Sequence, residues 1–164
     1  MAGDLFIKLG DITGESKSDG HVGEIEIMSW SWGATQSGST RAISGSTAGK
    51  VNVQDLTFTK LVCTATPNIL NAVCAGSSFP QALLICEKSA GNNKKPVQYL
   101  KIKLKNVLVS SHAIGGANGS DTHTETITLN FEACETTYTP MNADGTPGAG
   151  KPVAWNVVTG TNKY

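Results

Sequence analysis

Residues 122–134, THTETITLNFEAC, carry the clearest strand pattern in the chain. Polar and apolar side chains alternate along this stretch, and the apolar members are Ile127, Leu129, Phe131 and Ala133. A period of two is typical of a strand that buries one face and exposes the other. The stretch therefore predicts a half-buried strand, which is the arrangement that antiparallel sheets favour.

Other segments repeat this alternation at short intervals along the chain. In residues 98–111 the apolar positions alternate with a row of lysines, and in residues 51–62 the alternation slips near Gln54 and Asp55, which predicts a bulge there. Residues 33–50, GATQSGSTRAISGSTAGK, are rich in Gly, Ser and Thr and predict a long loop. The remaining strands are expected at residues 5–9, 24–32, 81–88 and 153–158.

One helix is expected, at about residues 66–75. Thr66 is the predicted N-cap, Pro67 fits the first helical position, and Gly76 fits the end of the last turn. Its predicted apolar face consists of Ile69, Leu70, Val73 and Cys74. Many short strands and one helix predict a mainly β fold: two antiparallel sheets that form a barrel or sandwich, with one flanking helix, in a single domain over residues 1–164.

Charge is scarce in this sequence. The 164 residues include 13 Lys and Arg and 13 Asp and Glu, a net charge of +0, and only 16% are charged against about 25% in typical soluble domains. A balanced, charge-poor surface argues against nucleic-acid binding and favours self-association. The apolar runs are too short to insert into a membrane, and the start, MAGDLFIKLGD, lacks the features of a signal peptide, so we expect folding in the cytosol.

Four cysteines are spread through the chain at positions 63, 74, 86 and 134. They form no CxxC pair and no cluster with histidine of the kind that binds metal, so no metal or cofactor is expected. In a reducing compartment we expect small buried side chains or tolerated thiols, and pairing after export stays open.

Three motifs suggest catalysis or nucleotide binding but lack the required context. Residues 145–151 match GxxxxGK, but Pro152 replaces the hydroxyl that binds magnesium. Residues 45–49 have the spacing of a nucleophile elbow without a strand before them. His123 and Glu125 share a strand face, which a solvated surface explains better than an acid–base pair.

Two side-chain rows allow a binding role. Trp30 and Trp32 lie two apart and are interpreted as core residues, with a sugar-stacking site as the alternative. The stripe Lys101, Lys103 and Lys105 could attract an anionic partner, although such rows usually form a solvated sheet face or a guarded edge. Because no aromatic residues alternate with these lysines, single-stranded nucleic acid is disfavoured.

The sequence resembles the haemolysin-coregulated protein (Hcp) family of type VI secretion. The resemblance covers nearly the whole chain up to Pro140, in the expected order. It rests on His21, on the helix start Thr66-Pro67-Asn68, and on FIKLGDITGES (6–16), EIEIMSWSWG (24–33), GKVNVQDLTFTK (49–60), VLVSS (107–111) and ETITLNF (125–131).

The resemblance implies a β-barrel with one helix and a structural, non-enzymatic role. Family members form homohexameric rings that stack into a tube, which a contractile sheath expels with a spike protein at its tip, and some hold small effector proteins in the ring. This chain would then be cytoplasmic before export and secreted without a cleaved signal. The alternatives are a tail-tube protein of a contractile phage-like particle, and a β-sandwich that binds carbohydrate or acts as an enzyme.

Two hypotheses follow for individual residues. Alternation places Ser29 and Ser31 on the face opposite Trp30 and Trp32, so the serines are candidates for the channel wall and for contact with cargo. A ring needs an interface between two different surfaces, and the long polar loop is a candidate for it or for ring stacking. The candidate loop residues are Gln36, Ser37, Ser39, Arg41, Ser44 and Thr47.

Overall fold

The computed structural model describes residues 3–39, 47–91 and 94–164. Within these residues the chain is mainly β, with a single helix, as predicted. The elements are β1 (Gly3–Leu9), β2 (Ile25–Glu26), β3 (Ser29–Ser31), β4 (Ala34–Ser39), β5 (Thr47–Val53), β6 (Leu56–Leu61), α1 (Thr66–Ala75), β7 (Ser78–Lys88), β8 (Val97–Gly115), β9 (Thr124–Asn130), β10 (Ala133–Tyr138) and β11 (Lys151–Asn156).

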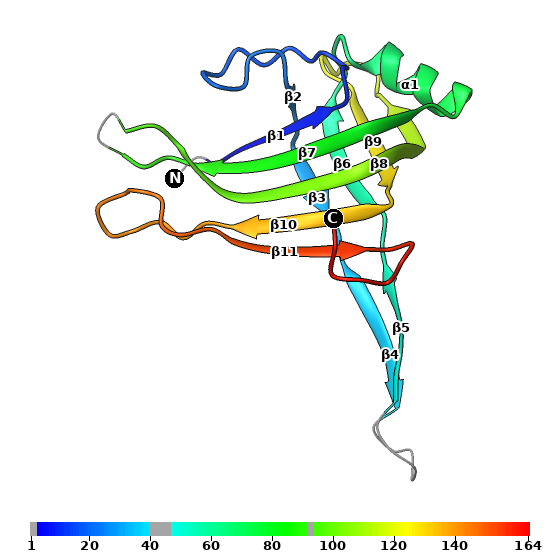
Figure 1. Cartoon of the computed structure of the whole chain (residues 1–164). Coiled ribbons are helices and arrows are strands. Elements are labelled where there is room, and N and C mark those ends of the chain that lie inside the picture. The colour runs from blue at the N-terminus through cyan, green and yellow to red at the C-terminus, as the bar shows by residue number, and fades with distance from the viewer. Residues whose placement is uncertain (1–2, 40–46, 92–93) are drawn as a thin grey trace.

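Two crossed layers of antiparallel strands form the body (Figure 1). The first layer contains β2, β1, β7, the first part of β8, β10 and β11; the second contains the last part of β8, β9, β6 and β3. Both layers belong to one continuous sheet, because β8 pairs first with β10 and then with β9. Crossed packing of this kind needs strands that bend from one layer into the other.

The bend in β8 lies at Asn106. Among the described residues, Asn106 is the non-glycine residue with a positive φ, which is 48°. It stands between the part of β8 that pairs with β10 and the part that pairs with β9. Asparagine tolerates this left-handed conformation better than most residues. The adjacent strand bends at the same level. The strand predicted over residues 122–134 is interrupted at Phe131 and Glu132 and continues as β10 in the other layer.

The segment predicted as one strand over residues 24–32 joins the two ends of the sheet. Its first part, β2, pairs with β1, and its second part, β3, pairs with β6. Between them, Ile27 donates its N–H to Leu5 and Met28 donates to Thr59. The sheet therefore curls until its ends meet at one segment, but no continuous ladder closes it, so a sandwich describes the fold better than a closed barrel.

The prediction of a loop over residues 33–50 is wrong, because the described part of this segment belongs to a two-stranded ribbon. β4 and β5 pair with each other and extend away from the body (Figure 1). The ribbon continues the β3–β6 pair, and the predicted irregularity at Gln54 and Asp55 is confirmed as the gap between β5 and β6. Pairing across the ribbon needs no apolar alternation, which is why the sequence pattern did not reveal it.

Helix α1 has the predicted bounds but a different cap and face. It begins after Ala65, which lacks a side-chain cap, and ends at Gly76 with a φ of 63°. The predicted N-cap, Thr66, is instead the first helical residue, and its hydroxyl bonds to the sheet. The buried helix residues are Thr66, Ile69 and Ala72, whereas Leu70 and Cys74 are exposed. None of the described helices is long and apolar enough to cross a membrane.

The core lies between the two layers and is almost entirely aliphatic and aromatic. Phe58 of β6 and Leu129 of β9 meet Leu84 of β7 and Leu104 of β8 in it. Each of these side chains is at most 1% exposed, and full burial of such a side chain contributes about 1.5–3 kcal/mol. The core fixes which strand faces point outwards.

Candidate functional site

The outer face of the second layer is a continuous surface of small hydroxyl side chains. Strand register places Ser29 opposite Thr59 and Ser31 opposite Thr57. The same register continues this row of hydroxyl side chains onto β9 and β8. The Oγ of Ser29 lies 2.6 Å from the Oγ1 of Thr59. We call this surface the hydroxyl face, and its members are Ser29, Ser31, Thr57, Thr59, Ser111, Thr126 and Thr128.

The two predicted lumen residues therefore lie side by side and exposed, as expected from alternation. Trp30 and Trp32 are half-buried and pack against the core, so the core interpretation is confirmed. The Nε1–H of Trp32 donates to the carbonyl of Gln54 at 2.8 Å. The threonines of the hydroxyl face were missed by the sequence reasoning, although they alternate with the buried Phe58 and Ile127 in their strands.

The β4–β5 ribbon presents two faces to solvent. Thr35, Gln36 and Ser37 are all exposed, and the register shifts at Ser37. The strands approach so closely that a Cβ at Gly49 would lie 1.8 Å from the carbonyl oxygen of Ser37. An isolated two-stranded ribbon is only marginally stable in water, so contacts with another molecule would stabilise it.

Most of the candidate loop residues are strand residues instead. Gln36 and Ser37 lie within β4, while Ser39 ends β4 and Thr47 begins β5. Arg41 and Ser44 lie outside the described residues.

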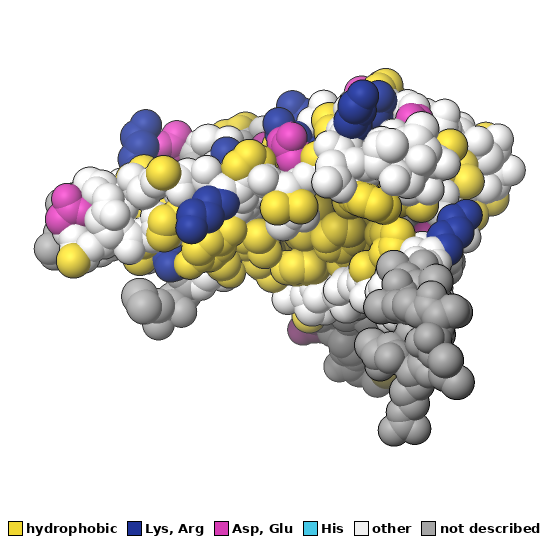
Figure 2. Space-filling view, turned by 60° about the horizontal axis from the view of Figure 1, so that its bottom comes forward, with side chains coloured by type: hydrophobic (Ala, Val, Ile, Leu, Met, Phe, Trp, Pro, Cys, Tyr) yellow, Lys and Arg dark blue, Asp and Glu magenta, His cyan; other side chains and the backbone are white. Residues whose placement is uncertain are grey.

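An apolar strip runs along the inner face of the first layer where that layer extends past the second. Register places Leu100 opposite Tyr138, and Ile102 opposite Thr136, which in turn faces Val153. Tyr138 is 49% exposed and Val153 is 71% exposed. Hydrophobic side chains also gather along one side of the body in Figure 2. Contiguous exposed apolar surface of this kind marks interaction sites.

A buried group of charged side chains joins α1 to the sheet. Lys60 of β6 and Glu125 of β9 face each other in register, form an ion pair, and are 0% and 1% exposed. The other Glu125 oxygen lies 2.5 Å from Nε2 of His112, and the Thr66 hydroxyl donates to Glu125 at 2.7 Å. The predicted solvated His123–Glu125 face is therefore wrong: His123 is exposed, and Glu125 is buried with other partners.

Electrostatics stabilise the charged form of Glu125. Burial alone would raise its pKa, but hydrogen bonds from His112, Lys60 and Thr66 and the charge of Lys60 outweigh burial and lower its pKa. The ammonium of Lys60 also reaches the carbonyl of Leu61 and the sulfur of Cys63. All these groups bond within the protein, so the cluster ties the turn before α1 to the sheet and presents no open catalytic position.

A second buried group fixes the long loop between β1 and β2. The ring of His21 stacks on Phe6 with centroids 4.2 Å apart. Its Nδ1 lies 2.7 Å from Glu24 and its Nε2 lies 2.6 Å from Glu87. Burial alone would lower the pKa of His21, but the bonds and charges of these two carboxylates outweigh burial and raise its pKa. The imidazole of His21 thus links the loop, through Glu24, to Glu87 of the first layer.

The other candidate motifs have structural roles. Residues 145–150 form a connection that enters β11, not the strand–loop–helix of a phosphate site. All four cysteines are free thiols; Cys86 and Cys134 are buried, and burial raises the pKa of both. Among the residues that the structure describes, no group of three His, Cys, Asp or Glu side chains could hold a metal ion.

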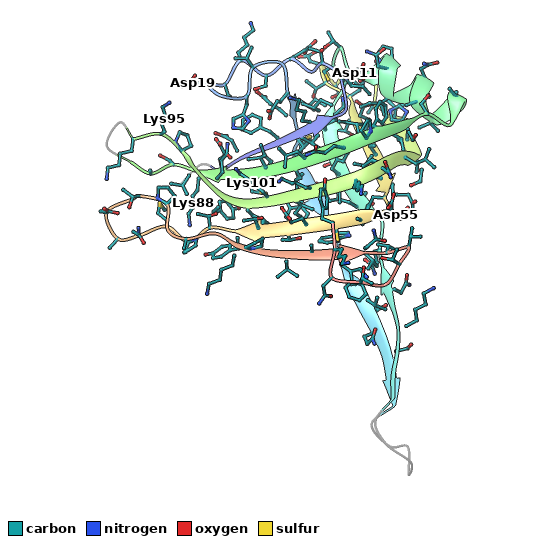
Figure 3. The ribbon with its side chains drawn as sticks, in the orientation of Figure 1. Asp11, Asp19, Asp55, Lys88, Lys95 and Lys101 are labelled. Carbon is teal, nitrogen blue, oxygen red and sulfur yellow. The ribbon has the colours of Figure 1, made fainter. Side chains whose placement is uncertain are left out.

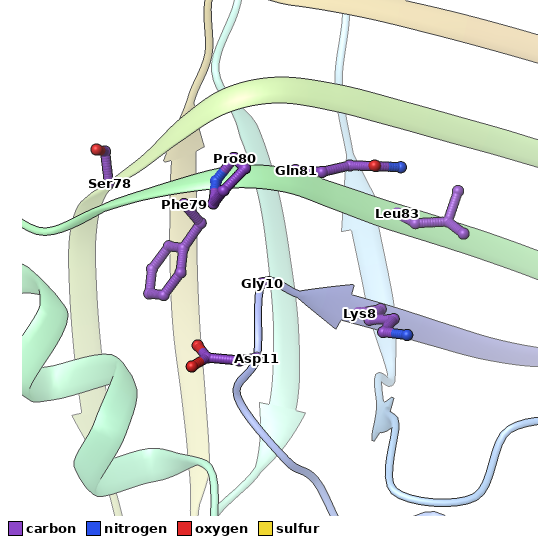
Figure 4. Close-up of a pocket in the computed structure, with 8 residues that line it drawn as sticks. All are labelled: Lys8, Gly10, Asp11, Ser78, Phe79, Pro80, Gln81 and Leu83. Atoms are coloured by element: carbon purple, nitrogen blue, oxygen red, sulfur yellow. The ribbon is translucent and has the colours of Figure 1, made fainter.

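An open pocket of about 670 Å³ lies on the outer face of β1 and β7 (Figure 4). Its wall combines Phe79, Pro80 and Leu83 with Lys8 and Asp11. The pocket therefore combines apolar side chains with one positive and one negative charge.

Comparison with known proteins agrees with this architecture. The family profile described as "Type VI secretion system effector, Hcp" matches residues 6–138. Protein hcp1 of Pseudomonas aeruginosa is 50% identical over 159 residues, which cover 96% of both chains.

Solved structures give the same result. A structure described as that of a type six secretion system protein superposes with a TM-score of 0.90 at 30% identity and covers 99% of this chain and 100% of its own. Hcp1 from Salmonella typhimurium gives a TM-score of 0.81 at 29% identity with the same coverage. The cap of the anti-feeding prophage tube, at 12% identity and a TM-score of 0.53, shares the fold alone.

The family match covers most of the chain, and the exposed faces that carry small hydroxyls and apolar side chains agree with a role in assembly. Hcp proteins form homo-oligomeric tubes and are secreted by the type VI system. The predicted family, fold class and non-enzymatic role are thereby confirmed. This chain belongs to the Hcp family and is a structural tube component of a type VI secretion system.

Proposed function

We propose that six copies of this chain close into a ring, that the rings stack into an exported tube, and that the hydroxyl face lines its channel. The observation that carries this assignment is the hydroxyl face itself, whose seven members are small, uncharged and at least partly exposed, and which is built on four adjacent strands. One carboxylate, Asp55, borders this face and accepts hydrogen bonds from Ser110 and Asn130. Small neutral side chains leave a channel open and let it accept small effector proteins of different surface charge.

The ring contacts would use surfaces that the fold leaves uncovered. A cyclic ring needs a heterologous interface, in which one surface meets a different surface of the next copy. The apolar strip at Tyr138 and Val153 and the projecting β4–β5 ribbon are two different surfaces of this kind. The ribbon residues Gln36 and Ser37 would contact a neighbouring subunit or ring.

The further partners follow from membership in the family. A spike protein would sit at the tube tip, a contractile sheath would surround the tube, and neither nucleic acid nor a membrane would be bound. The protein would be made in the cytoplasm and exported without a cleaved signal peptide.

Ring formation is tested by the mass of the purified protein in solution and by negative-stain electron microscopy. We expect a mass of six chains and rings with a central hole. A protein that stays monomeric at millimolar concentration would refute the proposal.

The channel assignment is tested with Ser31→Gln. A longer side chain on the hydroxyl face should leave the rings intact and weaken retention of cargo, whereas Ser89→Gln, at an exposed serine outside this face, should do neither. Loss of rings in Ser31→Gln alone would show that the hydroxyl face is buried between subunits.

Deletion of the central residues of segment 33–50 should spare the fold and shorten the tubes, and tubes of unchanged length would contradict the role of the ribbon.

A further inference from the structure

A lysine amine and a cysteine sulfur meet beneath α1, beside the Lys60–Glu125 ion pair. The Nζ of Lys60 donates a hydrogen bond to the Sγ of Cys63 at 3.2 Å. Lys60 is 0% exposed, whereas the lysines that Figure 3 labels are all at least partly exposed. Within the described residues, Cys63 is the cysteine whose sulfur accepts a hydrogen bond from a lysine. The ion pair explains the burial of Lys60 but not the thiol placed against its amine.

The turn before α1 holds these two atoms in place. The backbone N–H of Cys63 donates to the Thr66 hydroxyl at 3.1 Å, and the Thr66 N–H donates to the Cys63 carbonyl at 3.0 Å. Lys60 is fixed from its other side by Glu125 and by the carbonyl of Leu61 at 2.9 Å. Because other contacts hold both side chains, a reaction between the amine and the sulfur would need little further ordering.

Solvent reaches the sulfur but not the amine. Cys63 is partly exposed and lines an open pocket of about 350 Å³ together with Met28, Leu61 and Val62. Hydrogen peroxide is only a little larger than water, whose share of liquid volume is about 30 Å³, so the pocket admits it. An oxidant can therefore meet Sγ while Lys60 stays shielded from water.

We propose that Cys63 and Lys60 form a reversible sulfenamide, a covalent bond between Sγ and Nζ, when the protein meets hydrogen peroxide. A cysteine that is oxidised to sulfenic acid can condense with a nearby nitrogen in this way. Thiols stay reduced in the cytosol, and Hcp proteins are secreted by the type VI system, so the link would form after export.

The reaction consumes one peroxide and releases two waters. The Cys63 sulfur attacks the peroxide, the O–O bond breaks, and the sulfur is oxidised by two electrons to a sulfenic acid as the first water leaves. Lys60 passes one proton to Glu125, whose other oxygen lies 2.5 Å from Nε2 of His112, and rotation about Cε–Nζ turns the lone pair to Sγ. The N–S bond forms as the S–O bond breaks, and the leaving hydroxide takes a second proton from Nζ.

The link would change the group beneath α1 and protect the thiol. It would join β6 covalently to the turn before α1, and the positive charge of Lys60 would pass as a proton to Glu125 and His112. Oxidation beyond sulfenic acid is generally irreversible, and the bond to nitrogen would prevent it. It would also keep Cys63 from forming disulfides with other chains.

The test maps tryptic peptides of the full chain before and after treatment with hydrogen peroxide. Trypsin cuts after unmodified lysines, so the reduced protein yields peptides 51–60 and 61–88. A bond at Nζ blocks the cut at Lys60 and yields one peptide, 51–88, which lacks two hydrogens and is lighter by about 2 Da than the same uncut peptide with a free thiol. Free thiols are blocked before digestion, and dithiothreitol should restore the cut.

We expect the uncut peptide to rise at least about tenfold when wild type is treated. Cys63→Ser keeps the size of the side chain and removes the sulfur, so its uncut peptide should stay at the untreated level. The control, Cys74→Ser, removes an exposed thiol of α1 and should behave as wild type. Wild-type protein recovered after export should carry the link, and protein from lysed cells should not.

Four results would overturn the proposal. They are complete cutting after Lys60 in treated wild type, and an uncut peptide that rises equally in Cys63→Ser. A 61–88 peptide lighter by about 2 Da would contain a disulfide instead, and a 51–88 peptide heavier by about 14 Da would contain an inserted oxygen. The proposed function is tested separately, because the peptide map records a bond within one chain and does not change if no rings form.

Discussion

Glu125→Gln removes one charge from the buried group beneath α1 while preserving the size of the side chain. Lys60, which is 0% exposed, would lose its counter-ion and keep only neutral partners such as the carbonyl of Leu61. Removing one partner of a buried ion pair costs about 3–5 kcal/mol. Since domains of this kind are stable by about 5–15 kcal/mol, the variant should lose a large part of its unfolding free energy.

The assay is urea unfolding followed by fluorescence, repeated at several protein concentrations so that assembly and folding are separated. With an m-value of about 2 kcal/mol per molar urea, the midpoint should fall by about 1.5–2.5 M. Glu135→Gln is the matched control, because its partner Lys103 is 42% exposed and such a pair contributes about 0–1 kcal/mol.

The pH dependence gives an independent check. Because the folded pKa of Glu125 is lowered, its stabilisation is fully present above the ordinary value of 4.5 and is lost as pH falls through the folded pKa. Wild type should therefore lose more stability than Glu125→Gln on acidification. If Glu125→Gln costs no more than Glu135→Gln, the pair is not desolvated in solution and the reasoning is wrong.

Three further changes test other parts of the fold. His21→Gln should lower the free energy of unfolding by about 1.5–3 kcal/mol at pH 6, measured by urea unfolding. Because the folded pKa of His21 is raised, the difference from wild type should shrink as pH rises through that pKa. A difference that does not depend on pH would contradict a stabilising positive charge on the imidazole. Asn106→Val should cost about 1–2 kcal/mol in thermal unfolding and Asn106→Gly less, since both variants lose the hydrogen bond to Glu132 but only glycine tolerates the left-handed backbone at the bend. Gly49→Val should leave the unfolding midpoint of the body nearly unchanged and disrupt tube formation in electron micrographs, because its Cβ clashes with Ser37 in the ribbon; normal tubes would show that the ribbon is not needed.

The strands of the core and the helix could be predicted because their signals are local. Alternation in residues 125–131 and the Pro67 and Gly76 boundaries of α1 depend on backbone geometry and burial within a few residues. β4 and the first part of β5 could not be found in this way, since their Gly, Ser and Thr residues give no alternation.

The sequence contains a signal for the buried ion pair, but that signal alone does not predict the pair. Lys60 continues the phase of the buried Leu56 and Phe58, and Glu125 continues that of Ile127 and Leu129. Each charge sits at a core position of its own strand, yet a charge in a strand is usually exposed. Only the register of β6 with β9 shows that the two charges meet.

The sequence by itself determined the class of the fold, the faces of most strands and the place of the helix, because side-chain direction alternates along a strand and helix boundaries are set by neighbouring residues. Tertiary structure alone decided how these faces combine. Strand register brought serines and threonines from four strands into one surface and paired Lys60 with Glu125. Contacts between residues far apart in the chain depend on the pairing of whole strands, which no local pattern encodes.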